Sequence, residues 1–228
     1  MARTGWSAKD KSGRAILVWD FPTRLFHWLT AALIAVAYIT YLVGWMDWHA
    51  VAGDAALTLV VFRLLWGFFG SQTARFSRFV AAPRAAFGHL AQIFRREPDR
   101  QVGHNAAGGW MVLLLLALVL GEALSGIYVQ NEVANQGPLS EITPARVANA
   151  ITASHRIFWD ALLAAILLHV TAIIVYAAAK GQDLLRPMVT GWKTLPAGVA
   201  QPHVAGKLRA ALLLGISALA VAALASFV

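Results

Sequence analysis

Residues 155–170 read HRIFWDALLAAILLHV, an apolar segment with a histidine at each end. Together with the apolar residues that follow, this segment predicts a membrane-spanning helix over residues 157–179. His155 and His169 are fourteen residues apart, which in an α-helix corresponds to about 1400°, roughly 40° short of four turns, and to a rise of about 21 Å. Both imidazoles therefore lie on nearly the same face of one helix, at two different depths in the membrane.

Four further apolar stretches are long enough to cross a bilayer, at residues 25–44, 51–70, 106–129 and 208–228. The chain of 228 residues is 59% hydrophobic and 13% charged, about half the charged fraction of a soluble domain. Polar residues in the second, third and fourth spans are expected to face protein or cofactor, because hydrocarbon resists them. After Arg209 at its start, the fifth span holds only apolar and small residues, which indicates a peripheral anchor in membrane lipid. The predicted fold class is therefore an all-α, polytopic membrane helix bundle.

The positive charges indicate how the bundle is oriented. Sixteen of the nineteen lysines and arginines lie before the first span, between the second and third, or between the fourth span and the start of the fifth, where Arg209 is counted, whereas Arg146 and Arg156 lie on the opposite side. The positive-inside rule then predicts a cytoplasmic N-terminus and an extracytoplasmic C-terminus. The net charge of +8 is thus a topology signal, and nucleic acid is excluded as a partner. The start of the chain lacks a small-residue cleavage site, so we expect no cleavable signal peptide.

The chain has seven histidines and no cysteine. Without cysteine, disulfides, iron–sulfur clusters, thiolate metal sites and covalent haem attachment are excluded, so imidazoles would have to hold any redox centre. His27 lies near the cytoplasmic start of the first span, at the level of His169, and His49 lies at the outer start of the second, at the level of His155. Two histidine pairs stacked across the membrane are what bis-imidazole ligation of two haems requires. The alternative is that any single one is a hydrogen-bonded packing residue.

Two other intramembrane residues fit the haem interpretation. Gly53 follows His49 by one helical turn, where a porphyrin would need room against the backbone; the alternative is close helix packing. Arg63 lies fourteen residues beyond His49, near the inner level, and a buried cation needs an anionic partner. A haem propionate would supply that partner, and the alternatives are Glu122 in the third span or a backbone carbonyl.

The other three histidines are not expected to bind iron. His104, just before the third span, has no histidine partner at its level and is interpreted as an interfacial polar residue. His89 and His203 lie in cytoplasmic segments and are interpreted as surface residues. Residues 83–94 place apolar side chains at helical spacing among arginines, which predicts a short amphipathic helix in the inner interface; the alternative is an ordinary loop.

Several segments also carry a family resemblance. They are VWDFPTRLFHW (18–28), HAVAGDAALTLVVFRLLWGFFGSQTARF (49–76), GHNAAGGWM (103–111), and HRIFWDALLAAILLHV (155–170) followed by LLRPMVTGWK (184–193). In this order they resemble the bacterial cytochrome b561 and nickel–iron hydrogenase b-type cytochrome family. The resemblance implies a four-helix core that binds two b haems through His27, His49, His155 and His169. It also implies a di-haem core over residues 1–193, a linker with the fifth helix over 194–228, and a place in the bacterial inner membrane with the C-terminus periplasmic.

The resemblance further implies a function. In that family electrons pass between the membrane quinone pool and an extracytoplasmic redox partner, which is a hydrogenase, another dehydrogenase or a c-type cytochrome. Because the chain has no large extramembrane domain, we interpret it as an electron-transfer subunit rather than a complete enzyme. One alternative is a stand-alone oxidoreductase that oxidises superoxide at the outer haem and reduces quinone. Another is a haem-free transporter or scaffold, which would require the four-histidine pattern to be a coincidence.

A quinone would need an apolar slot with polar groups near the membrane edge. The inner side offers Asp20, Arg24, His104 and Asn105, and we expect quinone there. The outer side offers an acidic rim of Asp47, Asp54 and Glu132, which is suited to a positively charged redox partner. The alternative for the four inner residues is that they only anchor helix ends in the headgroup region.

Overall fold

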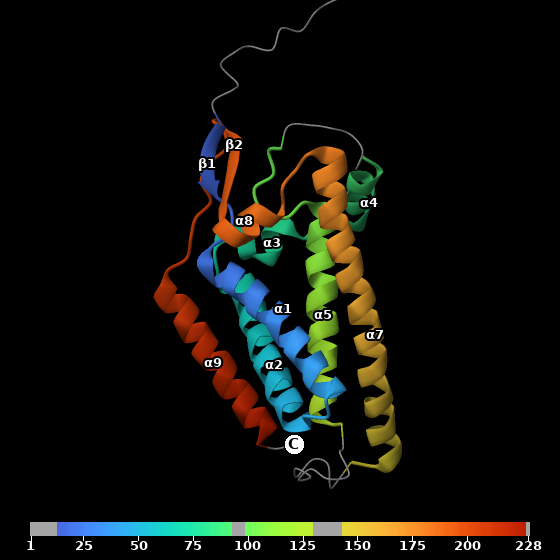
Figure 1. Cartoon of the computed structure of the whole chain (residues 1–228). Helices are drawn as coiled ribbons and strands as arrows, with labels where there is room; N and C mark the ends of the chain where they lie inside the picture. Colours follow the sequence, from blue (N-terminus) through green and yellow to red (C-terminus); the bar gives the residue numbers. More distant parts are fainter. Residues whose placement is uncertain (1–12, 93–98, 130–142, 227–228) are drawn as a thin grey trace, which may run out of the picture.

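The computed structural model describes residues 13–92, 99–129 and 143–226. Within these ranges five long helices lie side by side (Figure 1): α1 (Phe21–Leu42), α2 (Met46–Phe69), α5 (Ala106–Ile127), α7 (Ala145–Val175) and α9 (Lys207–Ala225). Each of them is long and apolar enough to cross a membrane. The predicted all-α, polytopic membrane bundle is thereby confirmed.

The fourth spanning helix, α7, is longer than predicted. It begins at Ala145, twelve residues before the expected start at 157. Residues 145–156 are rich in alanine and contain neither proline nor glycine, so the helix continues beyond the apolar stretch that hydropathy detects. A π-helical segment, η3 (Tyr176–Lys180), extends α7 to Gly181, whose φ of 66° is left-handed. His155 therefore lies ten residues inside the helix rather than at its start.

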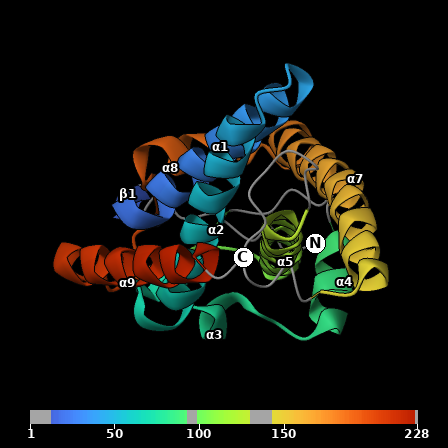
Figure 2. The same cartoon turned by 90° about the horizontal axis from the view of Figure 1, so that it is seen from below.

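Helix α2 lies at the centre of the packing. It contacts α1, α5 and α9, and α5 also contacts α7. Seen along the bundle, α2 and α5 lie between α9 and α7 (Figure 2). Val60 on α2, Leu116 on α5 and Leu162 on α7 form a buried cluster where these helices meet. Within the described ranges α1 and α7 do not pack closely, but the stacked rings of Tyr38 and Trp159, with centroids 4.9 Å apart, bridge them.

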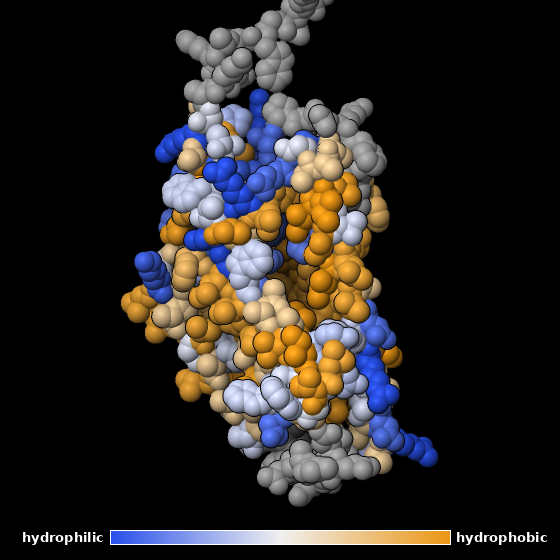
Figure 3. Space-filling view, in the orientation of Figure 1, coloured by the Kyte–Doolittle hydropathy of each residue, from blue (hydrophilic) through white to orange (hydrophobic). Residues whose placement is uncertain are grey.

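The shorter elements gather at one end of the bundle, where α1 begins and α7 ends. They are β1 (Gly13–Leu17), η2 (Gln72–Ala74), α3 (Phe76–Phe79), α4 (Pro83–Ala91), α8 (Leu185–Thr190) and β2 (Trp192–Pro196). We call this the basic end, because the loops predicted to carry most lysines and arginines meet here; hydrophilic residues gather on it in Figure 3. The opposite end, where residues 43–45 join α1 to α2, is called the turn end.

Five of the basic residues used for the topology prediction lie outside the described ranges, as does one acidic residue of the proposed outer rim. They are Arg3, Lys9, Lys11, Arg95, Arg96 and Glu132.

A two-stranded ribbon closes the basic end, and nothing in the sequence pattern predicted it. β1 pairs antiparallel with β2, with Gly13 opposite Pro196 and Leu17 opposite Trp192. Ile16 on β1 and Leu195 on β2 are buried in a small apolar cluster. The ribbon therefore joins the segment before α1 to the segment after α7. Since β2 spans residues 192–196, it crosses the predicted boundary at 193/194, and that division stays a prediction.

Helix α4 corresponds to the predicted amphipathic helix over residues 83–94. It ends at Ala91, and residues 93 and 94 lie outside the described ranges. It packs against α5, and Phe87 on it is 71% exposed. Its position in a membrane interface stays a prediction.

The last helix, α9, is attached to the basic end of α2 by hydrogen bonds. The Arg209 guanidinium donates to the carbonyl of Phe69 at 3.1 Å, and the backbone N–H of Ala205 donates to Ser71 Oγ at 2.9 Å. Further along α9, Ser217 and Val221 are buried, which fits the packing of this helix on α2. Its opposite face exposes leucines, as expected of a helix that borders lipid.

Candidate haem-binding site

The inner histidine pair forms between α1 and α7. The ring centroids of His27 and His169 are 6.3 Å apart. An imidazole nitrogen binds a first-row metal ion at about 2 Å, so two rings on opposite sides of one iron have centroids roughly 6 Å apart. The spacing therefore fits one metal atom between the two rings.

The outer pair forms between α2 and α7. The ring centroids of His49 and His155 are also 6.3 Å apart, with the ring planes at 87°. His155 and His169 project from the same helix toward two different neighbours, as the helical spacing predicted. Between the levels of the two pairs, the Tyr38–Trp159 stack bridges α1 and α7.

Hydrogen bonds orient the two rings of the outer pair. His49 Nδ1 lies 2.9 Å from the carbonyl of Ala37, and His155 Nδ1 lies 3.0 Å from the carbonyl of Glu122. A carbonyl can only accept, so in each ring Nδ1–H donates and Nε2 carries the free lone pair. That tautomer is the one in which Nε2 can bind a metal.

Two groups beside His155 were not assigned to the site from the sequence. Glu122 Oε1 lies 3.3 Å from His155 Nε2, a contact that an iron bound to this nitrogen would replace. A Cβ at Gly126 would lie 3.1 Å from His155 Cε1, so this glycine makes room for the imidazole. The position of Glu122 beside the outer pair also argues against the alternative in which it neutralises Arg63.

Arg63 is buried near the basic end of α2, with 2% of its surface exposed. Its guanidinium lies over the rings of Phe76 and Phe79, with Cζ 5.4 and 6.0 Å from their centroids. One terminal nitrogen, Nη1, is buried without a hydrogen-bond partner. The guanidinium can therefore still receive an anionic group.

Gly53 borders open space. A Cβ built on it would meet no heavy atom within 4 Å. Close helix packing, the alternative interpretation of this glycine, therefore does not explain it, whereas a bulky group beside α2 would make use of the space.

The four residues predicted for quinone have different surroundings. Asp20 caps α1 by accepting from the N–H of Thr23 at 2.7 Å, and its other oxygen accepts from Trp66 Nε1 at 3.1 Å. Arg24 donates to the carbonyl of Val189 at 2.6 Å. Both residues thus have clear roles in anchoring α1 at the basic end.

Asn105 belongs to a polar cluster at the start of α5. Its side-chain oxygen caps α5 by accepting from the N–H of Gly108 at 2.7 Å, and its amide donates to Tyr176 Oη at 3.1 Å. Tyr176 Oη lies 2.7 Å from His89 Nε2. Burial, aided by the charge of Lys180, lowers the pKa of His89, which favours the neutral imidazole in this hydrogen bond. His89 is therefore more than the surface residue expected from the sequence.

His104 is held by two aromatic rings. Its imidazole lies 4.5 Å from the ring of Trp19 and 4.8 Å from that of Phe79, centroid to centroid. Its Nδ1 is buried without a hydrogen-bond partner. Burial lowers the pKa of His104 to about 3, and the charge of Arg63 and the nearby His169 and His27 contribute in the same direction. The imidazole is therefore neutral.

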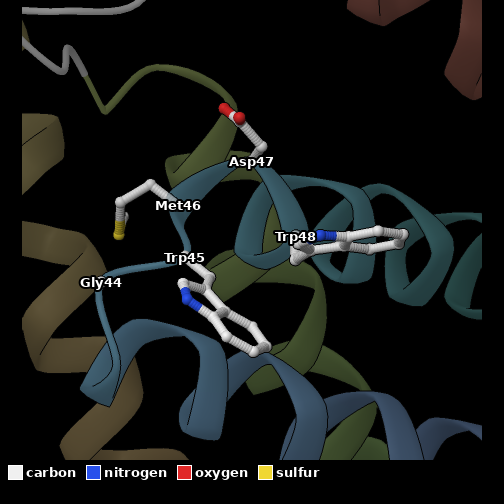
Figure 4. Close-up of a pocket in the computed structure, with 5 residues that line it drawn as sticks. All are labelled: Gly44, Trp45, Met46, Asp47 and Trp48. Atoms are coloured by element: carbon white, nitrogen blue, oxygen red, sulfur yellow. The ribbon is translucent and has the colours of Figure 1, made fainter.

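At the turn end, an open hollow of about 420 Å³ is lined by residues 44–48 (Figure 4). The indoles of Trp45 and Trp48 are exposed, and the Asp47 carboxylate points away from Trp45. Exposed tryptophans at this level fit the aromatic belt of a membrane–water interface.

Comparison with known proteins agrees with this architecture. The chain is 26% identical over 220 residues to a protein of Azotobacter chroococcum mcd 1 named "Probable Ni/Fe-hydrogenase B-type cytochrome subunit", covering 81% of this chain and 91% of that protein. No solved structure matches the chain. The profile of the family described as prokaryotic cytochrome b561 matches residues 18–191. The chain therefore belongs to the prokaryotic cytochrome b561 family, and it is a multi-pass membrane b-type cytochrome of electron transport.

Proposed function

We propose that this cytochrome holds two b haems, one between His27 and His169 and one between His49 and His155, and carries electrons between them across the membrane. The single observation that supports this most directly is the pair of equal 6.3 Å spacings at two depths of one helix. Each haem would supply an iron that changes reversibly between two oxidation states. Neutral imidazoles hold such an iron in both states, which suits electron transfer rather than catalysis.

The protein's own residues set the environment of each pair. The carbonyls of Ala37 and Glu122 fix the tautomer and the orientation of His49 and His155. Gly53 leaves room beside α2, and Arg63 supplies a buried positive charge on the inner side.

Haem stoichiometry tests the proposal. Pyridine haemochrome analysis of the purified protein should give two b haems per chain, because there are two histidine pairs. It should give no c-type haem, because the chain has no cysteine to attach one. A content of one haem, or of none, in protein purified under haem-replete conditions would contradict the di-haem assignment.

We further propose that the basic end faces the cytoplasm of a bacterium and that the turn end meets the redox partner. The asymmetry of lysine and arginine supports this orientation. The exposed Asp47 at the turn end is suited to a positively charged partner surface. Since the Azotobacter relative is named as a hydrogenase subunit, a hydrogenase is one candidate partner, and another dehydrogenase or a c-type cytochrome are the others.

A second candidate function is a stand-alone oxidoreductase that passes electrons from superoxide to quinone. In this case a small substrate would react at the membrane surface, near the outer histidine pair. Purification separates the two functions: a redox protein that copurifies stoichiometrically supports the subunit, and superoxide-dependent quinone reduction by the isolated chain supports the enzyme.

For quinone, we propose a site at the basic end near the inner pair, in a respiratory chain of the inner membrane. Of the four residues predicted there, Asn105 offers the best support, because its amide and Tyr176 Oη form a hydrogen-bonding group at the start of the apolar helix α5. Asp20 and Arg24 would shape the site through the start of α1.

The Asn105→Asp variant tests this site. Aspartate keeps the oxygen that caps α5 but removes the amide donor. Inhibition by a quinone analogue should weaken about five- to tenfold, which corresponds to about one hydrogen bond. His203→Ala, a change in the exposed linker at the same end, is the matched control. Unchanged inhibitor affinity in Asn105→Asp, with both haems intact, would move the quinone site elsewhere.

A further inference from the structure

Buried polar atoms without hydrogen-bond partners are concentrated around the inner histidine pair. Three of them belong to His27 (Nδ1), His104 (Nδ1) and Arg63 (Nη1), on three different parts of the chain. A buried donor or acceptor left unpaired costs about 1–3 kcal/mol. Several such atoms in one region indicate a polar group that they would share.

Arg63 and His104 both lie near one aromatic ring, that of Phe79. Arg63 Cζ is 6.0 Å from the centroid of Phe79, and the imidazole of His104 is 4.8 Å from it. The charge of Arg63 and the rings of His169 and His27 all act electrostatically on His104. Through Phe79 the two donors therefore lie close to each other.

The protein's own carboxylate in this region is already engaged. Asp20 accepts from the N–H of Thr23 through one oxygen and from Trp66 Nε1 through the other. Its charge acts on Arg63, yet Nη1 of Arg63 keeps no hydrogen-bond partner. Asp20 therefore leaves both Arg63 and His104 able to bind a further anion.

We propose that His104 and Arg63 together bind the propionate carboxylates of the haem held between His27 and His169. This assignment rests on the proposed function. It gives His104 a role at the inner haem in place of its predicted role in the quinone site. The neutral imidazole donates its single N–H to a carboxylate oxygen, and the guanidinium donates from Nη1. The loop before α5, which carries His104, thereby becomes part of the cofactor site although it supplies no iron ligand.

Two variants of His104 test the proposal in the full-length protein. His104→Ala removes the donor, whereas His104→Asn places an amide near the position of Nδ1. His203→Ala is the matched control at the same end. In His104→Ala the inner haem should transfer to apomyoglobin about tenfold faster or more, the effect of one lost hydrogen bond to a charged group. Its midpoint potential should also fall, and His104→Asn should restore part of both changes.

A modified cofactor identifies which group His104 contacts. Protein loaded with haem dimethyl ester has no propionate charge, so His104→Ala should then have little effect on haem transfer or on potential. An equal effect with the ester, a shift of the outer haem only, or no change in either measurement would overturn the assignment. If the wild-type chain binds no haem between His27 and His169, the proposed function itself fails, and haem stoichiometry reveals that separately.

Discussion

In the His169→Ala protein we expect the absorption of one b haem, that of the inner pair, to disappear, and in His155→Ala that of the outer pair. Each substitution removes one of two iron ligands, and a single imidazole holds a haem far less firmly in a membrane interior. Haem content should fall by about half in each variant, with the remaining component close to its wild-type spectrum. Reduced-minus-oxidised spectra and haem analysis of the purified variants measure this directly.

The partner residues provide a strict check of the pairing. His27→Ala should lose the same spectral component as His169→Ala, and the double variant should lose no more than either single one, because the two residues hold one haem. His49→Ala should match His155→Ala in the same way. Loss of the same component from His155→Ala and His169→Ala would show that the pairs are wrongly assigned, and His203→Ala should retain both haems.

The second large effect concerns Arg63. Replacing Arg63 with leucine should lower the midpoint potential of the inner haem by about 50–100 mV, because a nearby positive charge favours the reduced state. Potentiometric titration of the visible bands should show this shift in one component, with the outer haem nearly unchanged. Arg63→Lys keeps the charge and should shift the potential less.

The matched control for Arg63 is Arg78→Leu. Arg78 is exposed on α3 at the same end of the bundle, so the change in net charge is identical but is screened by solvent. A shift of similar size in both variants, or a shift confined to the outer haem, would contradict a role of Arg63 at the inner pair.

The histidine pairs could be predicted from the sequence because a membrane helix converts sequence spacing into depth. His155 and His169 are separated by nearly four whole turns, and the alternation of spans gives each one a single partner level. The spacing alone, however, could not show which hydrogen bond fixes each ring, because that depends on carbonyls such as that of Ala37 on a neighbouring helix.

The position of Glu122 could also have been found by the same depth argument. It lies sixteen residues into α5, about 24 Å from the basic end, whereas Arg63 lies six residues from the end of α2 at that side. The two residues are therefore at different depths, and Glu122 belongs with the outer pair. The role of Gly126 depends on the rotation of α5 relative to α7, which no spacing within one helix determines.

The ribbon could not be predicted because its strands are short and far apart in the sequence. Gly13 and Pro196 are separated by 183 residues, and neither strand has the alternation of apolar and polar residues that marks a strand. The long α7 was missed for a different reason. Hydropathy detects the part of a helix that lies in lipid, and the alanine-rich start of α7 is helical without being strongly apolar.

The ribbon also forms late in the synthesis of the protein, because its two strands lie near opposite ends of the core. At about 5–20 residues per second, β2 leaves the ribosome roughly ten seconds or more after β1, when all four core helices have already been made. Among the residues that the structure describes, the other hydrogen bonds from the start of α1 to this region are also late, since Arg24 and Trp28 donate to carbonyls of α8. These contacts between the start of α1 and the end of α7 therefore form last, and a ribosome that stalls before residue 192 would leave a chain that has all four proposed iron ligands but lacks the ribbon.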